Sequence, residues 1–175
     1  MHVRDVLLDA FARIDEEVRQ TLEGLDAEQL AFRPREQANS IAWLAWHLTR
    51  VQDDHVSDLA GLAQVWVADG WHARFGKPAE AGDTGFGYTA EQVAAIRPAG
   101  PGVLLEYFGV VHARTVEYVR RLEANDLDRE LDEPQWQTPV TVGVRLVSVI
   151  SDCLQHVGQM AYIRGLIEDR HWLPY

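Results

Sequence analysis

Four long stretches of this 175-residue chain carry apolar residues three and four positions apart, and this spacing constrains the fold more than any other feature. An α-helix brings such positions onto one face, which must then be buried against other helices. The expected helices cover residues 3–25, 40–62, 101–125 and 142–168. No strong hairpin signal competes with them. The pattern predicts a single all-α domain over residues 1–175, folded as a four-helix bundle.

The segment between the second and third helices, residues 65–101, loses this pattern and is rich in glycine and proline. Within it, Thr89 and Gln92 form a capping box that predicts a short helix ending near Ile96. Bundle helices are normally joined by about 2–8 residues, so this crossover is unusually long. We expect it to be ordered and to line the mouth of a pocket; capping of the core, or a homodimer contact, is the alternative. Its aromatic residues are Trp66, Trp71, Phe75, Phe86 and Tyr88.

Composition and charge argue against several classes of function. The formal net charge is −11, from 27 acidic and 16 basic residues, which argues against a binder of nucleic acid or anionic lipid. The sequence has no apolar run long enough to span a membrane, and its charged N-terminus does not resemble a secretory signal. A single cysteine, Cys153, excludes an internal disulfide and a paired-cysteine metal motif. We therefore expect a soluble, cytoplasmic protein.

The fourth predicted helix carries an acid and a histidine one turn apart, Asp152 and His156, on one face. Asp152 has apolar neighbours, and a carboxylate buried there without a partner is costly. A shared cation would satisfy the pair, and so would a simple side-chain contact between positions i and i+4. A third metal ligand is expected from an inward face of another helix. His47 is the first candidate, His55 the second and His112 a weaker third.

Other residues are candidates for the surroundings of such a site. Asp54 follows His47 by two turns, where it would orient an imidazole; a solvated carboxylate at a helix edge is an equally good interpretation. Gln159 continues the face of the fourth helix, and Trp46 is a candidate wall of the pocket, although packing is its simpler role. Cys153 is expected to be a small buried residue and not a nucleophile.

Two segments resemble a known family. NSIAWLAWHLTRVQDDH (residues 39–55) and DCLQHVGQMAYIRGL (residues 152–166) are similar to motifs of the DinB-like superfamily. The branch resembled includes mycothiol-dependent maleylpyruvate isomerases and related thiol S-transferases. The resemblance covers nearly the whole chain and implies a four-helix bundle with a long second crossover. It also implies a divalent metal held by His47, Asp152 and His156. Relatives carry His or Glu at the middle position, so the shorter Asp152 is a departure from the family pattern.

Two histidines and one carboxylate suit a catalytic Zn²⁺ ion with an open fourth position, and the same set accepts Ni²⁺ or Fe²⁺. The resemblance implies a metal-dependent thiol S-transferase or isomerase. Such an enzyme activates a low-molecular-weight thiol, mycothiol in the branch named, for attack on an electrophilic small molecule. The alternative hypothesis is a non-catalytic bundle in which the metal has a structural or stress-related role.

Overall fold

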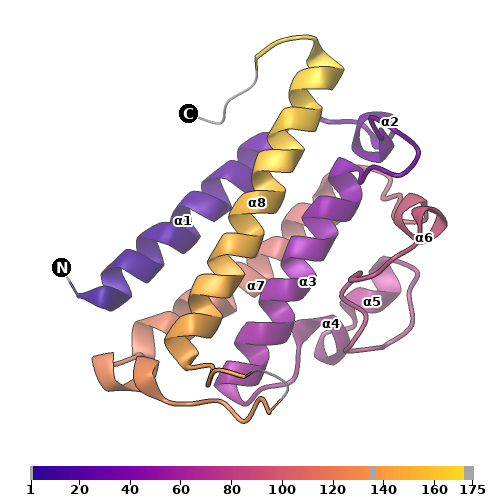
Figure 1. Cartoon of the computed structure of the whole chain (residues 1–175). Helices are drawn as coiled ribbons and strands as arrows, with labels where there is room; N and C mark the ends of the chain where they lie inside the picture. Colours follow the sequence, from indigo (N-terminus) through magenta and orange to yellow (C-terminus); the bar gives the residue numbers. More distant parts are fainter. Residues whose placement is uncertain (1, 135–136, 172–175) are drawn as a thin grey trace.

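A computed structural model of the chain describes residues 2–134 and 137–171. Its four long helices are α1 (Val3–Leu22), α3 (Ile41–Ala60), α7 (Gly102–Arg121) and α8 (Val142–Glu168), shown in Figure 1. Helix α3 packs against α7 and α8, and α1 packs against the same two helices. Apart from one isolated bridge, the described residues are without β-structure. The predicted all-α four-helix bundle is therefore confirmed.

The core consists of the apolar faces that the spacing predicted. Helix α8 buries Val149, Cys153 and Val157, each four residues apart and at most 1% exposed. Helix α1 contributes Phe11 and Ile14 from the opposite side of the core. Complete burial of one such side chain contributes about 1.5–3 kcal/mol to stability, so the long helices are held mainly by packing. Within the described residues, no helix combines the length and apolarity needed to cross a membrane.

Local signals set the helix ends. Ser40 caps α3 by accepting a hydrogen bond from the backbone nitrogen of Trp43 at 3.1 Å. Helix α8 has the predicted bounds and begins after Thr141, whose side chain accepts from Val144. Helix α1 ends three residues earlier than its apolar spacing suggests. Gly24 has a φ of +75°, which turns the chain out of the helix.

A short helix, α2 (Ala27–Ala31), lies in the connector between α1 and α3. Its N-cap, Asp26, accepts hydrogen bonds from the backbone nitrogens of Glu28 and Gln29, and the side chain of Gln29 bonds back to Asp26. This capping box is readable from the sequence D-A-E-Q. The connector therefore continues the core, since Leu30 of α2 is fully buried.

The long crossover is packed along the outer side of α3 (Figure 1). It contains three short helices: α4 (Val65–Ala68), α5 (Trp71–Arg74) and α6 (Ala90–Ala94). The expected capping box of Thr89 and Gln92 begins α6, whereas α4 and α5 were not expected. This arrangement brings residues 81–88 of the crossover against the middle of α3.

Candidate metal centre

Three side chains from two helices converge where α3 packs against α8. His47 belongs to α3, and Asp152 and His156 belong to α8; one ligand atom of each lies within 4.8 Å of the other two. Nε2 of His156 is 3.5 Å from Oδ1 of Asp152. Two ligands of a tetrahedral zinc ion with bonds of about 2.1 Å lie about 3.4 Å apart. His47 is buried while Asp152 and His156 are partly exposed, so the cluster is at the edge of the core and open on one side.

Both imidazoles are oriented by a hydrogen bond at Nδ1. Nδ1 of His47 lies 2.5 Å from the backbone carbonyl oxygen of Thr84, and Nδ1 of His156 lies 3.1 Å from Oε1 of Gln159. Because these oxygens only accept, Nδ1 of each ring carries a proton, and in the neutral form of the ring Nε2 retains a lone pair. Histidines that bind metals commonly have this second hydrogen bond. Gln159 therefore contacts the cluster, as its position on the helix face suggested.

Asp152 has a buried carboxylate oxygen, Oδ2, that has no hydrogen-bond partner among the described residues. A buried oxygen of this kind is costly unless a donor or a cation lies against it. Two neutral imidazoles and one carboxylate are also donors that divalent first-row metals accept. The cluster therefore fits a divalent cation, and three protein donors leave a position for another ligand.

The two histidines have opposite pKa shifts. Burial lowers the pKa of His47, partly offset by its hydrogen bond to Thr84, so this ring is neutral near neutral pH. Burial also tends to lower the pKa of His156. Hydrogen bonds to Asp152 and Gln159, together with the negative charge of Asp152, outweigh burial and raise the pKa overall. A cation bound at the cluster would displace the proton from His156, since a ligand imidazole must be neutral.

Aromatic rings and one glycine enclose His47. The indole of Trp43 is stacked on the imidazole, with ring centroids 4.6 Å apart and an interplanar angle of 10°. Gly85 has a φ of +88°, and a Cβ there would lie 2.7 Å from the ring of Trp46 and 3.3 Å from both Nδ1 of His47 and Nε1 of Trp43. Gly85 thus allows the crossover to reach the imidazole, a role that the sequence analysis did not assign.

The sequence profile of mycothiol-S-transferases matches residues 6–169, nearly the whole chain. The chain belongs to the mycothiol-S-transferase family. This family is DinB-like, so the resemblance found in the sequence is confirmed. The fold is also similar to a crystal structure of a conserved protein from Enterococcus faecalis, with 28% identity and a TM-score of 0.88 over 97% of this chain and 99% of that one. No curated protein matches the sequence significantly.

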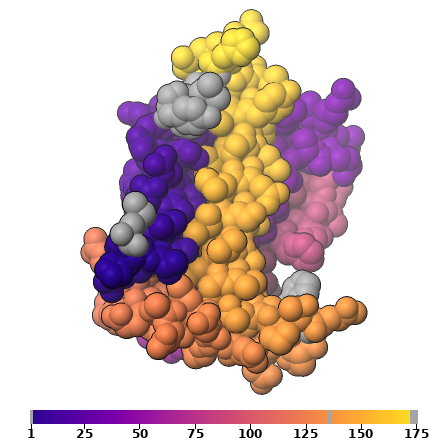
Figure 2. Space-filling model, turned by 60° about the vertical axis from the view of Figure 1, so that its left-hand side comes forward, coloured from indigo at the N-terminus to yellow at the C-terminus, as the bar shows by residue number. Residues whose placement is uncertain are grey.

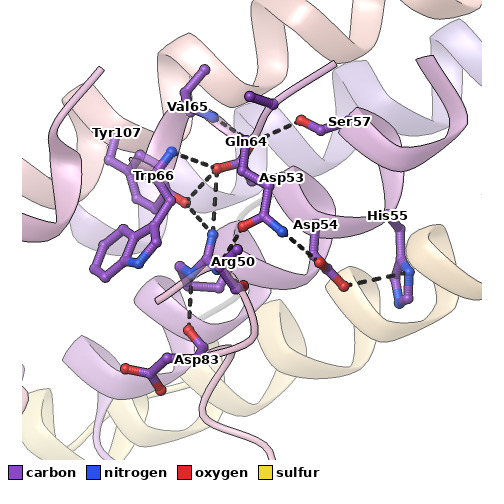
Figure 3. A network of polar contacts seen from close by, with 12 residues as sticks. Arg50, Asp53, Asp54, His55, Ser57, Gln64, Val65, Trp66, Asp83 and Tyr107 are labelled. Carbon is purple, nitrogen blue, oxygen red and sulfur yellow. Dashed lines mark hydrogen bonds and ion pairs between the residues drawn. The ribbon is translucent and has the colours of Figure 1, made fainter. Parts of the chain in front are cut away.

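In this mycothiol-S-transferase family member, a buried arginine connects α3 to the crossover (Figure 3). Arg50 is 0% exposed. Its Nε donates to the carbonyl oxygen of Asp83 at 3.0 Å, and Nη2 donates to that of Ala81 at 2.6 Å. Thr84, which orients His47, is the next residue along the chain. Arg50 therefore fixes the backbone that directs a candidate metal ligand. The sequence offers one signal for this role, which is the position of Arg50 one turn after His47 on the same helix.

The charge of Arg50 is balanced by Asp53, which is equally buried (Figure 3). The Asp53 carboxylate accepts hydrogen bonds from the backbone nitrogens of Val65 and Trp66 and from the hydroxyl of Tyr107. Burial raises the pKa of that hydroxyl, so Tyr107 remains a donor. Arg50 and Asp53 together fasten the beginning of the crossover and residues 81–83 to α3.

The structure does not bring three other polar candidates to the cluster of His47, Asp152 and His156, the candidate metal-ligand cluster. Asp54 accepts a hydrogen bond from Gln64 at 2.6 Å and pairs with His55, so the Thr84 carbonyl, and not Asp54, orients His47. His55 lies against Arg145 of α8. His112 is stacked on Phe108 of its own helix.

The crossover aromatics divide into three kinds. Trp66 and Trp71 are buried around the ring of Tyr107, at centroid distances of 5.6 and 5.3 Å, and so extend the core. Tyr88 stacks on the buried Trp46 at 5.8 Å, which places this pair beside Gly85 and His47. Phe86 is 92% exposed and its ring points away from the protein interior. Of the expected pocket walls, only Trp46 and Tyr88 lie beside this cluster, and Trp43 has to be added.

Cys153 is 0% exposed, and its sulfur lies 3.8 Å from Oε1 of Gln52 and 3.9 Å from the carbonyl oxygen of Leu48. Burial raises the pKa of this thiol well above its ordinary value. A thiol in such surroundings is neutral and inaccessible, which agrees with the expected role in packing.

Proposed function

We propose that the protein is a metal-dependent transferase that joins a low-molecular-weight thiol, mycothiol, to an electrophilic small molecule. The observation that carries the proposal is the convergence of two Nε2 lone pairs and the unpartnered Oδ2 of Asp152 at a half-open edge of the core. A divalent metal held by His47, Asp152 and His156 would supply a Lewis acid that lowers the pKa of a coordinating thiol. Zinc is the metal that this donor set favours, with nickel and iron as alternatives.

The chain's own residues then have defined tasks. Thr84 and Gln159 keep both Nε2 atoms directed at one point, and Trp43 limits rotation of the His47 ring by stacking on it. Asp152 supplies one negative charge, so the site with a divalent cation retains one positive charge that favours an anionic sulfur. In the reaction a sulfur–carbon bond forms, the leaving group of the electrophile departs with its bonding electrons, and the thiol proton passes to solvent.

A structural metal is the competing function. A purely structural zinc site normally has four protein ligands. Among the described residues, the cluster at α3 and α8 offers three, and this favours catalysis. We place the activity in the cytoplasm, where low-molecular-weight thiols are kept reduced.

The test uses the purified full-length chain. Elemental analysis is expected to give one equivalent of a divalent metal. After replacement by Co²⁺, titration with mycothiol is expected to produce a sulfur-to-cobalt absorption band in the near ultraviolet, which S-methyl mycothiol does not produce. Transfer to bromobimane, followed by chromatography of the thioether, measures turnover. A bound metal whose spectrum mycothiol leaves unchanged would establish the structural role instead.

A further inference from the structure

A groove of about 530 Å³ lies between the segment entering α3 and the C-terminal half of α8. Its floor includes the buried side chains of Leu44 and Ile163. Figure 2 shows the outer face of α8, in orange and yellow, at the surface of the molecule. The groove is therefore open to a ligand from solvent. The remaining lining residues are Gln37, Ala38, Asn39, Gln155, Gly158, Gln159 and Tyr162.

The groove adjoins the candidate metal centre through one shared residue. Gln159 lines the groove, and its Oε1 accepts the hydrogen bond from Nδ1 of His156 at 3.1 Å. Gln155, one residue before His156, lines the groove as well and also lines a second depression beside Asp152. A molecule with its sulfur at the metal-ligand cluster would thus have its remaining atoms beside these two glutamines.

The lining has an unusual composition for so acidic a chain, because it contains no Asp, Glu, Lys or Arg. Four of its side chains are primary amides, each of which both donates and accepts hydrogen bonds. The side chains of Gln37 and Asn39 make no hydrogen bond to described residues, so their amides are available to a ligand. Tyr162 adds an aromatic ring that is 69% exposed.

Amides with an exposed aromatic ring match a neutral molecule rich in hydroxyl groups, since each hydroxyl also donates and accepts and a sugar ring packs on an aromatic face. They match a charged peptide thiol poorly, because its carboxylates would be desolvated without a cationic partner. The net charge of −11 adds a general repulsion of anions.

We propose that this groove binds the uncharged glycoside portion of the thiol cosubstrate and selects it over charged peptide thiols. The inference rests on the proposed function, because it takes the thiol to be mycothiol, whose cysteinyl group is attached to a sugar–inositol glycoside. Gln155 and Asn39 determine the specificity without contacting the metal, and Gln159 connects the glycoside to the ring of His156.

The experiment separates the groove from the metal chemistry by using a thiol-free probe, N-acetylglucosaminyl-inositol. The probe is titrated into metal-free, chelator-treated protein, and the side-chain amide signals of glutamine and asparagine are followed by NMR. We expect saturable shifts of the groove amides. A Gln155→Leu variant is expected to bind the probe about 5–10-fold more weakly, the effect of one lost hydrogen bond. Gln20→Leu, on α1 and outside the groove, is the matched control and is expected to bind normally.

Two thiols complete the test in the metal-loaded protein. Gln155→Leu is expected to raise the KM for mycothiol by a similar factor and to leave the KM for N-acetylcysteine, which lacks the glycoside, unchanged. Equal effects on both thiols, or no shift of any groove amide with about 10 mM probe, would overturn the inference. Probe binding without any thiol transfer would instead refute the proposed function and leave the groove assignment standing.

Discussion

The carbonyl oxygen of Thr84 accepts a hydrogen bond from Nδ1 of His47 at 2.5 Å, although the two residues are 37 positions apart. A crossover backbone atom thus decides which nitrogen of a candidate metal ligand is free. The contact gives a physical reason for the length of the crossover, since a tight turn between α3 and α7 would leave His47 without this acceptor. Residues 81–85 are therefore part of the site, and two predictions concern how they are held.

Gly85→Ala is expected to weaken both stability and metal affinity. The new Cβ would lie 2.7 Å from the ring of Trp46 and 3.3 Å from Nδ1 of His47, at a φ of +88° that side chains rarely adopt. Gly87→Ala is the matched control, because Gly87 has a φ of +75° but nothing within 4 Å of the added Cβ. Backbone strain costs roughly 1–3 kcal/mol at either position. Urea unfolding and metal titration should show a stability loss in both variants and an affinity loss in Gly85→Ala alone; equal metal affinities would contradict the prediction.

Arg50→Lys is expected to lower metal affinity about 10–100-fold, the usual effect of disturbing a group that supports a ligand. Lysine keeps the charge opposite Asp53 but cannot reproduce the planar fork that reaches the carbonyls of Ala81 and Asp83. Thr115→Val serves as the control, because it removes a buried hydrogen bond from Gln52 of α3 without touching the crossover. The Co²⁺ absorption spectrum should change in the first variant and not in the second. If both variants melt at a lower temperature but have the same Co²⁺ spectrum, Arg50 has a purely structural role.

The long helices and the shared face of Asp152 and His156 followed from periodicity, because spacings of three and four determine which side chains share a face, whereas the choice of His47 over His55 and His112 was settled by the family resemblance. Asp152 and His156 are one turn apart on α8, and His47 lies on the buried face of α3 that packs against it. Backbone acceptors such as Thr84 leave no trace in a sequence, which is why Asp54 was the expected partner of His47.

The role of Arg50 was not predicted, for a different reason. A buried guanidinium contradicts the simple apolar pattern, and its partners, which include the carboxylate of Asp53 and the carbonyls of Ala81 and Asp83, come together only in the folded chain. The aromatic character of Phe86 suggested a pocket wall, but its side chain is 92% exposed, a difference that the sequence does not reveal.

His47→Ala and His156→Ala are each expected to abolish most metal binding while helical content remains near the wild-type value. The four apolar faces do not depend on the cluster, and each variant leaves only two protein ligands. Elemental analysis with circular dichroism checks both quantities. His112→Ala, which alters a histidine outside the cluster, should retain the full metal content. Unchanged stoichiometry in both cluster variants would refute the ligand assignment.

Asp152→Asn and Asp152→Glu test the departure of this chain from its relatives. Asn has the same shape but lacks the negative charge, so metal affinity and thiol transfer should both fall by at least about tenfold. Glu keeps the charge and is the acid expected in the related branch, so it should retain part of both. If Asn behaves like the wild type, Asp152 is only a hydrogen-bond partner of His156.

Cys153→Ala is expected to keep thiol-dependent turnover, because the thiol that reacts is supplied by the cosubstrate. The native Cys153 is fully buried, and burial raises the pKa of its thiol, so the thiolate is absent at neutral pH. Iodoacetamide should therefore leave the native protein unlabelled over hours at pH 8 and label it fully in guanidinium chloride, as measured by intact mass. Rapid labelling of the folded protein that also stops turnover would show that Cys153 takes part in the reaction.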